Sequence, residues 1–209
     1  MSNERNSSLN LVLGMVGYLH IVDELTDDDF QKIAKVILRE SGIIKNIALA
    51  PGNIISYMYP LKDNEKAIGL DYLENDKQRG AVIRAVKTGR IIIAGPVDLV
   101  QGGEGFIARI PVYKGEQRTN YWGIASIVVD TFKLYDKIKI LHSWQWIEYA
   151  LKGKDAKGRD GEQFLGKESV YDKNPVEIEV MLPEGSWILS AVPKDGRDNI
   201  NIRNIIIIR

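Results

Sequence analysis

The first forty residues carry two helical patterns of apolar positions. Between residues 5 and 24, apolar side chains recur at steps of three and four, which predicts a helix over this range. They form two neighbouring stripes, one of Leu9, Val12, Val16 and Leu19 and the other of Leu11, Met15, Tyr18 and Val22. Two stripes suit a helix that packs on its own domain and on a second subunit. They suit equally a helix that is buried in one core.

A second helix is predicted from residue 27 to about residue 40, with signals at both ends. Thr26 is a good N-cap, and the aspartates at 27–29 put negative charge on the first turn, where the helix dipole favours it. Gly42, after Ser41, marks the end. Three consecutive aspartates can resemble a metal site, but at this position they are typical of a capped helix start.

From Ile43 onward the pattern changes to strands. The runs predict a hairpin at 43–61 around Ala-Pro-Gly-Asn, a short strand or turn at 66–73, a helix at 76–90, a second hairpin at 91–115 and a buried strand at 121–132. In the helix at 76–90, Val82, Ile83 and Val86 are expected to face inward, and Gly89 is the expected cap. This order predicts an α+β fold: a long N-terminal helix and a five-stranded antiparallel sheet.

After about residue 139 the strand pattern begins again. Four further strands are predicted at 143–153, 162–167, 176–182 and 186–194, with a polar turn at 154–161. We therefore expect a first segment of two helices (1–42), a sheet domain (43–138) and a second, smaller domain (139–209).

The hairpin at 91–115 has two prolines where a sheet would need N–H donors. Gly95-Pro96 interrupts the first strand and Pro111 the second. We expect ladder pairing to end at both prolines, where a pocket wall could open, and Gly95 to let the backbone bend.

Composition excludes several functions. Charge is balanced at 28 basic and 28 acidic residues, without a basic run that would suit nucleic acid. The absence of cysteine excludes a disulfide scaffold, a thiolate metal site and a cysteine nucleophile. His20 and His142 are far apart in sequence and lack a nearby partner at ligand spacing. The apolar run at 11–22 is shorter than the roughly 20 residues that span a bilayer. We predict no catalytic residues, no metal and no cofactor.

Several segments, in this order and spacing, resemble the CHASE domain, the extracytoplasmic sensory module of receptor histidine kinases, diguanylate cyclases and adenylate cyclases. The resemblance covers roughly residues 9–132. It is carried by APGN at 50–53, YPL at 59–61, GLDYL at 69–73, GPVDLVQGGEGF at 95–106 and PVY at 111–113.

The resemblance implies a stalk helix, a PAS-like ligand-binding domain and, as in the long form of the family, a second PAS-like domain near the membrane. It implies a homodimer formed through the N-terminal helix. It also implies a transmembrane helix on each side, on the periplasmic or extracellular face of the cell membrane. Those helices are not in this sequence, so an excised ectodomain is expected. The kinase or cyclase that it would control would lie outside these residues, which fits a sensor without enzymatic activity.

The candidate ligand-binding residues follow from the PAS-like arrangement. They are Tyr57, Tyr59, Asp71, Tyr72, Ile93, Gly95, Pro96, Arg109, Pro111, Tyr121 and Trp122. Asp71 matches an aspartate that hydrogen-bonds cytokinins in plant members of the family, although it would equally suit a helix cap or a turn. Because neighbouring strand residues point to opposite faces, these residues cannot all line one cavity.

Arg109 is the most informative candidate, because a charge within an apolar strand must be exposed, paired or directed at a ligand. Pairing with Asp71 is one alternative. If Arg109 faces the cavity, the expected ligand is anionic, such as a carboxylate or an amino acid. A free-standing periplasmic or extracellular binding protein is the rival function, and an enzyme with unrecognised chemistry is a less favoured one.

Overall fold

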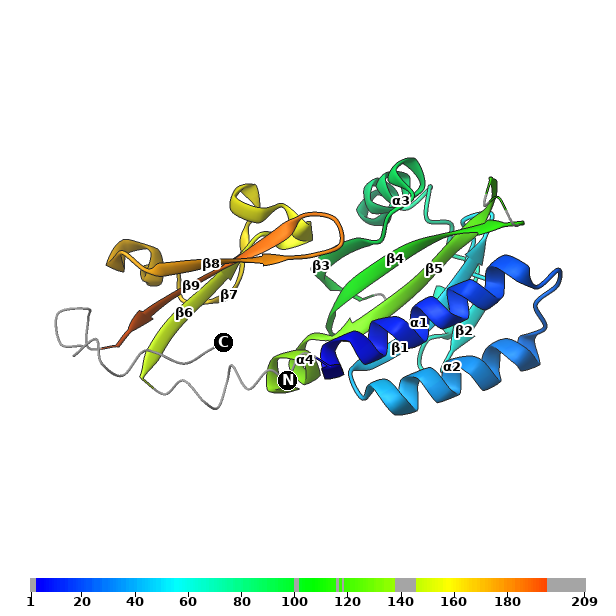
Figure 1. Cartoon of the computed structure of the whole chain (residues 1–209), viewed down its shortest axis with the longest axis horizontal. Helices are drawn as coiled ribbons and strands as arrows, with labels where there is room; N and C mark the ends of the chain where they lie inside the picture. Colours follow the sequence, from blue (N-terminus) through cyan, green and yellow to red (C-terminus); the bar gives the residue numbers. More distant parts are fainter. Residues whose placement is uncertain (1–2, 100–101, 116, 118, 138–145, 195–209) are drawn as a thin grey trace. The chain divides into compact units, whose positions relative to one another are not determined.

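The computed structural model describes residues 3–99, 102–115, 117, 119–137 and 146–194. The chain divides into two compact units, residues 1–137 and 138–209. Each unit contains its own antiparallel sheet (Figure 1). The predicted α+β fold, with an N-terminal helix and a five-stranded antiparallel sheet, is confirmed.

The first unit begins with two helices, α1 (Asn3–Ile21) and α2 (Asp27–Ser41). The predicted capping of α2 is confirmed: the Thr26 hydroxyl accepts a hydrogen bond from the Asp29 N–H, and Gly42 ends the helix with φ +68°. Among the described side chains of α1, both predicted stripes pack on the same core. The stripes therefore do not divide between two partners.

The sheet of the first unit has the strand order β2-β1-β5-β4-β3. Its strands are β1 (Ile44–Pro51), β2 (Tyr57–Tyr59), β3 (Ile92–Asp98), β4 (Glu104–Lys114) and β5 (Asn120–Asp130). A short helical turn η1 (Glu65–Ala67) and the helix α3 (Asp76–Thr88) lie between β2 and β3, and α4 (Thr131–Lys137) follows β5.

Alternation along the strands gives the sheet two apolar faces. One face packs on α1 and α2 through residues such as Ile47, Leu49 and Val112. The other packs on α3 and the segment before it, through residues such as Ile92 and Ile124. Figure 1 shows α1 and α2 together along the sheet, with α3 apart from them. The sheet is thus covered on both sides.

The helix α3 has the predicted cap, and two of the three residues predicted to face inward, Val82 and Val86, pack on the core. Gly89 ends it with φ +66°. Val82 and Ala85 are buried, whereas Ile83 is half exposed, so the prediction that Ile83 faces inward is wrong. Ile83 is one position after Val82, about 100° further around the helix, while Ala85 is three positions on and lies on the same face as Val82.

The prolines of the second hairpin lie where β3–β4 pairing is interrupted or has ended. The register between these strands shifts between Ala94 and Val97, and Gly95 takes φ +117°. The last β3–β4 pair at the other end is Ile92 with Arg109, so Pro111 lies two residues beyond it, although it still pairs with Ile124 of β5.

The second unit contains a four-stranded antiparallel sheet of order β7-β6-β9-β8. Its elements are β6 (Ile147–Lys152), η2 (Lys154–Ala156), η3 (Gly158–Asp160), β7 (Gln163–Gly166), η4 (Glu168–Lys173), β8 (Val176–Met181) and β9 (Ser186–Pro193). Val170 of η4 packs with Ala150 and Val192 in a small core.

Candidate functional site

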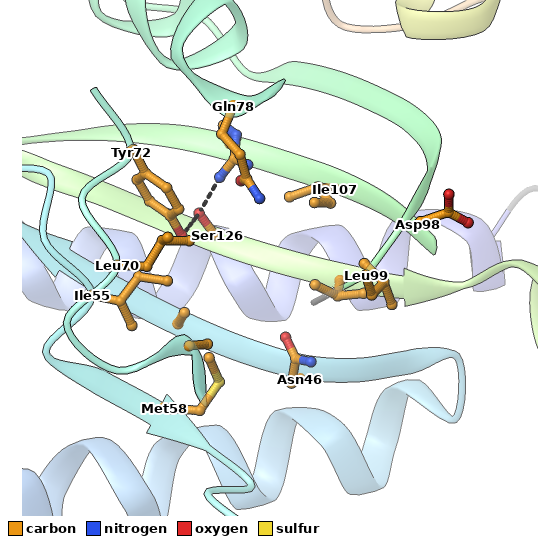
Figure 2. Close-up of a pocket in the computed structure, with 14 residues that line it drawn as sticks. Asn46, Ile55, Met58, Leu70, Tyr72, Gln78, Asp98, Leu99, Ile107 and Ser126 are labelled. Carbon is orange, nitrogen blue, oxygen red and sulfur yellow. Dashed lines mark hydrogen bonds between the residues drawn. The ribbon is translucent and has the colours of Figure 1, made fainter. Parts of the chain in front are cut away.

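A small cavity lies between the α3-side face of the first sheet and the segment that leads from β2 to α3. Its volume is about 40 Å³, which leaves room for a few water molecules at most. Its lining consists of Asn46, Ala48, Ile55, Met58, Ala67, Leu70, Tyr72, Gln78, Asp98, Leu99, Ile107, Arg109, Ser126 and Val128 (Figure 2). Most of these side chains are apolar, and the polar ones lie at more than one place on the cavity wall.

Arg109 is the largest fully buried side chain of the described residues, with 2% of its surface exposed. Its Nη1 donates to the Ser126 Oγ at 2.9 Å, and its Nη2 donates to the Gln78 Oε1. The guanidinium carbon lies 4.4 Å from the centre of the Tyr72 ring. Strand pairing explains part of this arrangement, since Arg109 and Ser126 are direct partners in β4 and β5.

The positive charge of Arg109 has no carboxylate partner among the described residues. Its acceptors are a hydroxyl and a neutral amide, and its Nε–H is buried without an acceptor. Burial lowers the pKa of the guanidinium from its ordinary value of 12.5, opposed by the adjacent Tyr72. Arginine nevertheless stays protonated in proteins. The cavity wall therefore contains a desolvated, unpaired cation, which is costly for the fold.

Ser126 joins the polar groups at this end of the cavity. Its Oγ accepts hydrogen bonds from the Tyr72 hydroxyl at 2.9 Å and from Arg109 at 2.9 Å. Figure 2 shows Tyr72, Gln78 and Ser126 grouped together, with Asn46 apart from them. Because both lone pairs of Ser126 are used, its own proton is left to donate.

Of the residues that the sequence indicated, Tyr72 and Arg109 line the cavity. Tyr57, Tyr59 and Trp122 instead pack on the core under α1 and α2. The Tyr57 hydroxyl donates to the Leu25 carbonyl at 3.0 Å. These three aromatic side chains therefore lie on the opposite face of the sheet and do not line this cavity.

Asp71 and Tyr121 also lie outside the cavity lining. The Asp71 Oδ1 accepts a hydrogen bond from the Leu73 N–H at 2.7 Å, so Asp71 is a turn residue and forms no pair with Arg109. The Tyr121 hydroxyl donates to the Asn53 Oδ1 at 2.5 Å. Burial raises the pKa of Tyr121 to about 12, and Tyr113 contributes. Both residues stabilise the loops next to the β1–β2 hairpin.

The remaining predicted residues shape the backbone and do not reach the cavity. Ile93 points to the face opposite Ile92, which pairs with Arg109 and shares its side of the sheet. Gly95, Pro96 and Pro111 are buried in β3 and β4 and are not part of the lining. Their role is to interrupt or end strand pairing.

Sequence reasoning missed Gln78, Ser126 and Asn46. Ser126 and Asn46 interrupt apolar strand runs, and each is almost fully buried. A polar residue in such a run is a signal that could have marked both. Gln78 lies on the first turn of α3 and has no distinctive signal in the sequence. His142, the second of the two histidines, lies outside the described residues.

Comparison with known proteins identifies the family. The family model described as "CHASE domain" matches residues 15–165, which is most of the chain. This chain belongs to the CHASE family. It is accordingly a ligand-binding sensor domain of the kind that receptors carry outside the cytoplasm. Among curated proteins, none matches the sequence.

Several solved structures have the same fold as this chain. An extracellular ligand binding receptor from Desulfohalobium retbaense has a TM-score of 0.68 at 14% identity, and the match covers 90% of this chain and 37% of that one. The ligand-binding domain of the Pseudomonas aeruginosa amino acid chemoreceptor PctC has a TM-score of 0.62 at 15% identity, covering 91% of both chains. The extracellular domain of a candidate histidine kinase has a TM-score of 0.60 at 10% identity, covering 90% of this chain and 85% of that one. The shared fold is the PAS-like sensor fold with two sheets.

Among the described residues, every helix is too short or too polar to cross a bilayer. The same part of the chain also lacks a group of three histidine and carboxylate side chains that could hold a metal ion.

Proposed function

We propose that this domain senses a small molecule with a carboxylate group, which binds to Arg109 in the cavity of the first unit. The observation that carries the proposal is the buried guanidinium without an anionic partner. A ligand carboxylate would supply the missing charge and accept two parallel hydrogen bonds, the arrangement that arginine favours. The PctC domain, which shares the fold, was solved in complex with GABA, a molecule with a carboxylate.

The hydrogen bonds that Arg109 makes without a ligand indicate where the carboxylate would bind. The Nε and Nη2 atoms lie on one edge of a guanidinium group and form a fork for a carboxylate. Here Nε–H has no acceptor, and Nη2 donates to Gln78. The ligand would therefore replace the Gln78 oxygen at this edge. Because the cavity is small, the ligand can enter only if the first turn of α3 moves.

Movement of α3 gives a route for signalling. A ligand that replaces Gln78 has different affinities for the two positions of α3, and such a difference is required for any population shift. In the intact receptor, flanking transmembrane helices would carry the change to a histidine kinase or a diguanylate cyclase. A free-standing binding protein is the alternative, and a full-length reading frame without hydrophobic helices on both sides would favour it.

The carboxylate proposal is tested by thermal shift with a panel of carboxylates and amino acids. For the wild-type chain, a ligand at 100 times its dissociation constant adds about 2.7 kcal/mol of stability, a rise of roughly 5–10 °C in melting temperature. Arg109→Ala should abolish that rise, and Arg84→Ala, at an exposed arginine of α3, should keep it. An equal rise in Arg109→Ala and wild type would contradict the proposal.

We also propose that α1 forms a homodimer contact. Leu13 and Ile21 of α1 are exposed, and between them Gly14 and Gly17 have open space around their α-carbons. A second helix could therefore approach this face closely. Sedimentation equilibrium of wild type and Leu13→Glu provides the test: the substitution should weaken dimerisation, whereas equal dissociation constants would exclude the contact.

A further inference from the structure

Asn46 is a second polar group of the cavity, at a distance from the Arg109 cluster. It lies on β1, is 1% exposed and lines the cavity. In the sheet register, Asn46 is level with Val128 and Arg109 is level with Ser126. The two residues are thus two strands and two residues apart, so their α-carbons are roughly 12 Å from each other.

The orientation of the Asn46 amide is determined by its neighbour Asn64. The Asn64 Nδ2 donates to the carbonyls of Pro60 at 2.9 Å and Lys62 at 3.2 Å, which leaves the Asn64 Oδ1 facing Asn46. An oxygen there requires a donor, and the Asn46 Nδ2 supplies it at 3.0 Å. The Asn46 Oδ1 is consequently turned away from Asn64.

The Asn46 Oδ1 is an acceptor that faces the cavity. Figure 2 shows this oxygen on the side of Asn46 that is nearer to Ser126. Among the described residues, it accepts no hydrogen bond. Because the Asn46 side chain is almost fully buried, a ligand donor that reaches its oxygen would stabilise the complex, and an apolar ligand would leave the oxygen without a donor.

We infer that Asn46 selects ligands that carry an N–H or O–H donor in addition to the carboxylate. This inference rests on the proposed function, because Arg109 must first hold the carboxylate. The cavity then has a cation at one place and an acceptor at another, so a ligand that reaches both carries a carboxylate and a separate donor group. Simple alkanoic acids would satisfy Arg109 but leave the Asn46 oxygen without a partner.

Matched probes test the inference. Isothermal titration is performed on the full 209-residue chain with L-alanine, L-lactate and propionate, and with 4-aminobutyrate and butyrate. In at least one set, the compound with the donor should bind about tenfold more tightly than the compound without it, the ratio that 1.4 kcal/mol gives. Asn46→Leu should remove this difference and leave the affinity for the donor-free acid unchanged. Asn120→Leu, at an exposed asparagine of β5, should preserve the difference.

The outcomes separate the two proposals. Equal binding within both sets, of L-alanine, L-lactate and propionate and of 4-aminobutyrate and butyrate, overturns the role of Asn46 and leaves carboxylate recognition intact. A difference that survives in Asn46→Leu but is lost in Asp98→Asn assigns the donor to the exposed carboxylate at the cavity wall and also overturns it. If no probe binds the wild-type chain, the proposed carboxylate recognition is contradicted, and the role of Asn46 is contradicted with it. The wild-type comparison is decisive even if Asn46→Leu does not fold.

Discussion

Arg109 shows how far a single residue can be interpreted from sequence. A charge in the run GFIARIPVY is an anomaly that the sequence alone reveals. Its surroundings could not be predicted, because Tyr72, Gln78 and Ser126 come from three separate segments that only the tertiary fold brings together. The expected alternatives of solvent exposure and pairing with Asp71 are both wrong, since Arg109 is buried and Asp71 belongs to a turn.

At this scale we predict that Arg109→Met stabilises the ligand-free protein. It removes a buried cation whose desolvation no carboxylate offsets, and methionine fills much of the same volume. The expected gain in the free energy of unfolding is about 1–4 kcal/mol, by analogy with buried ion pairs that are replaced by apolar residues. Urea unfolding measures it, with Arg84→Met expected to stay within about 0.5 kcal/mol of wild type. A loss of stability would mean that the contacts of Arg109 outweigh its burial.

At the scale of elements, helix ends could be predicted from a few neighbouring residues more reliably than the face of the sheet to which each strand residue points. The caps Thr26, Gly42 and Gly89 were identified correctly because capping depends on a few neighbouring residues. The pocket residues were only partly identified because alternation sorts a strand into two sets without showing which set faces α3. Register shifts, such as the one between Val112 and Tyr113, alter the alternation further.

Replacing either of two glycines by alanine should change the stability of the protein, in opposite directions. Gly95→Ala should destabilise the protein by about 1–3 kcal/mol, since Gly95 has φ +117° and an added Cβ would lie 2.9 Å from the Gly105 carbonyl oxygen. Gly80→Ala, in the exposed interior of α3 with no atom within 4 Å of the new Cβ, should stabilise it by roughly 0.5–1 kcal/mol. Urea unfolding of both variants is the measurement, and shifts of the same sign would refute the argument.

At the scale of the whole molecule, the two units have separate cores and are expected to unfold in separate transitions. Glu148 of β6 provides a label for the second unit. Its carboxylate accepts hydrogen bonds from Lys167 at 2.8 Å and Lys173 at 2.5 Å, and these two lysines lower its pKa to about 2. Above its ordinary pKa of 4.5, the group contributes its full stability, which is lost as the pH falls through about 2.

We therefore predict that Glu148→Gln makes the transition of the second unit less dependent on pH between 4.5 and 2. The transition of the first unit should not change. Thermal unfolding followed by circular dichroism across this range measures both, and added salt should weaken the effect because the lysines are partly exposed. Glu162→Gln, at a mainly exposed glutamate, is the control. A shift of both transitions by Glu148→Gln would show that the units unfold together.

The contact between Arg109 and Gln78 has a consequence for sensitivity. If a ligand must displace the Gln78 oxygen, the free energy of that contact is subtracted from the free energy of binding, so it sets the concentration at which the sensor responds. Gln78 does not choose the ligand, which Arg109 and Asn46 would do. A weaker acceptor at position 78 would lower the response threshold and leave chemical selectivity unchanged. Detection limit and selectivity would then be properties of different residues and could be adjusted independently.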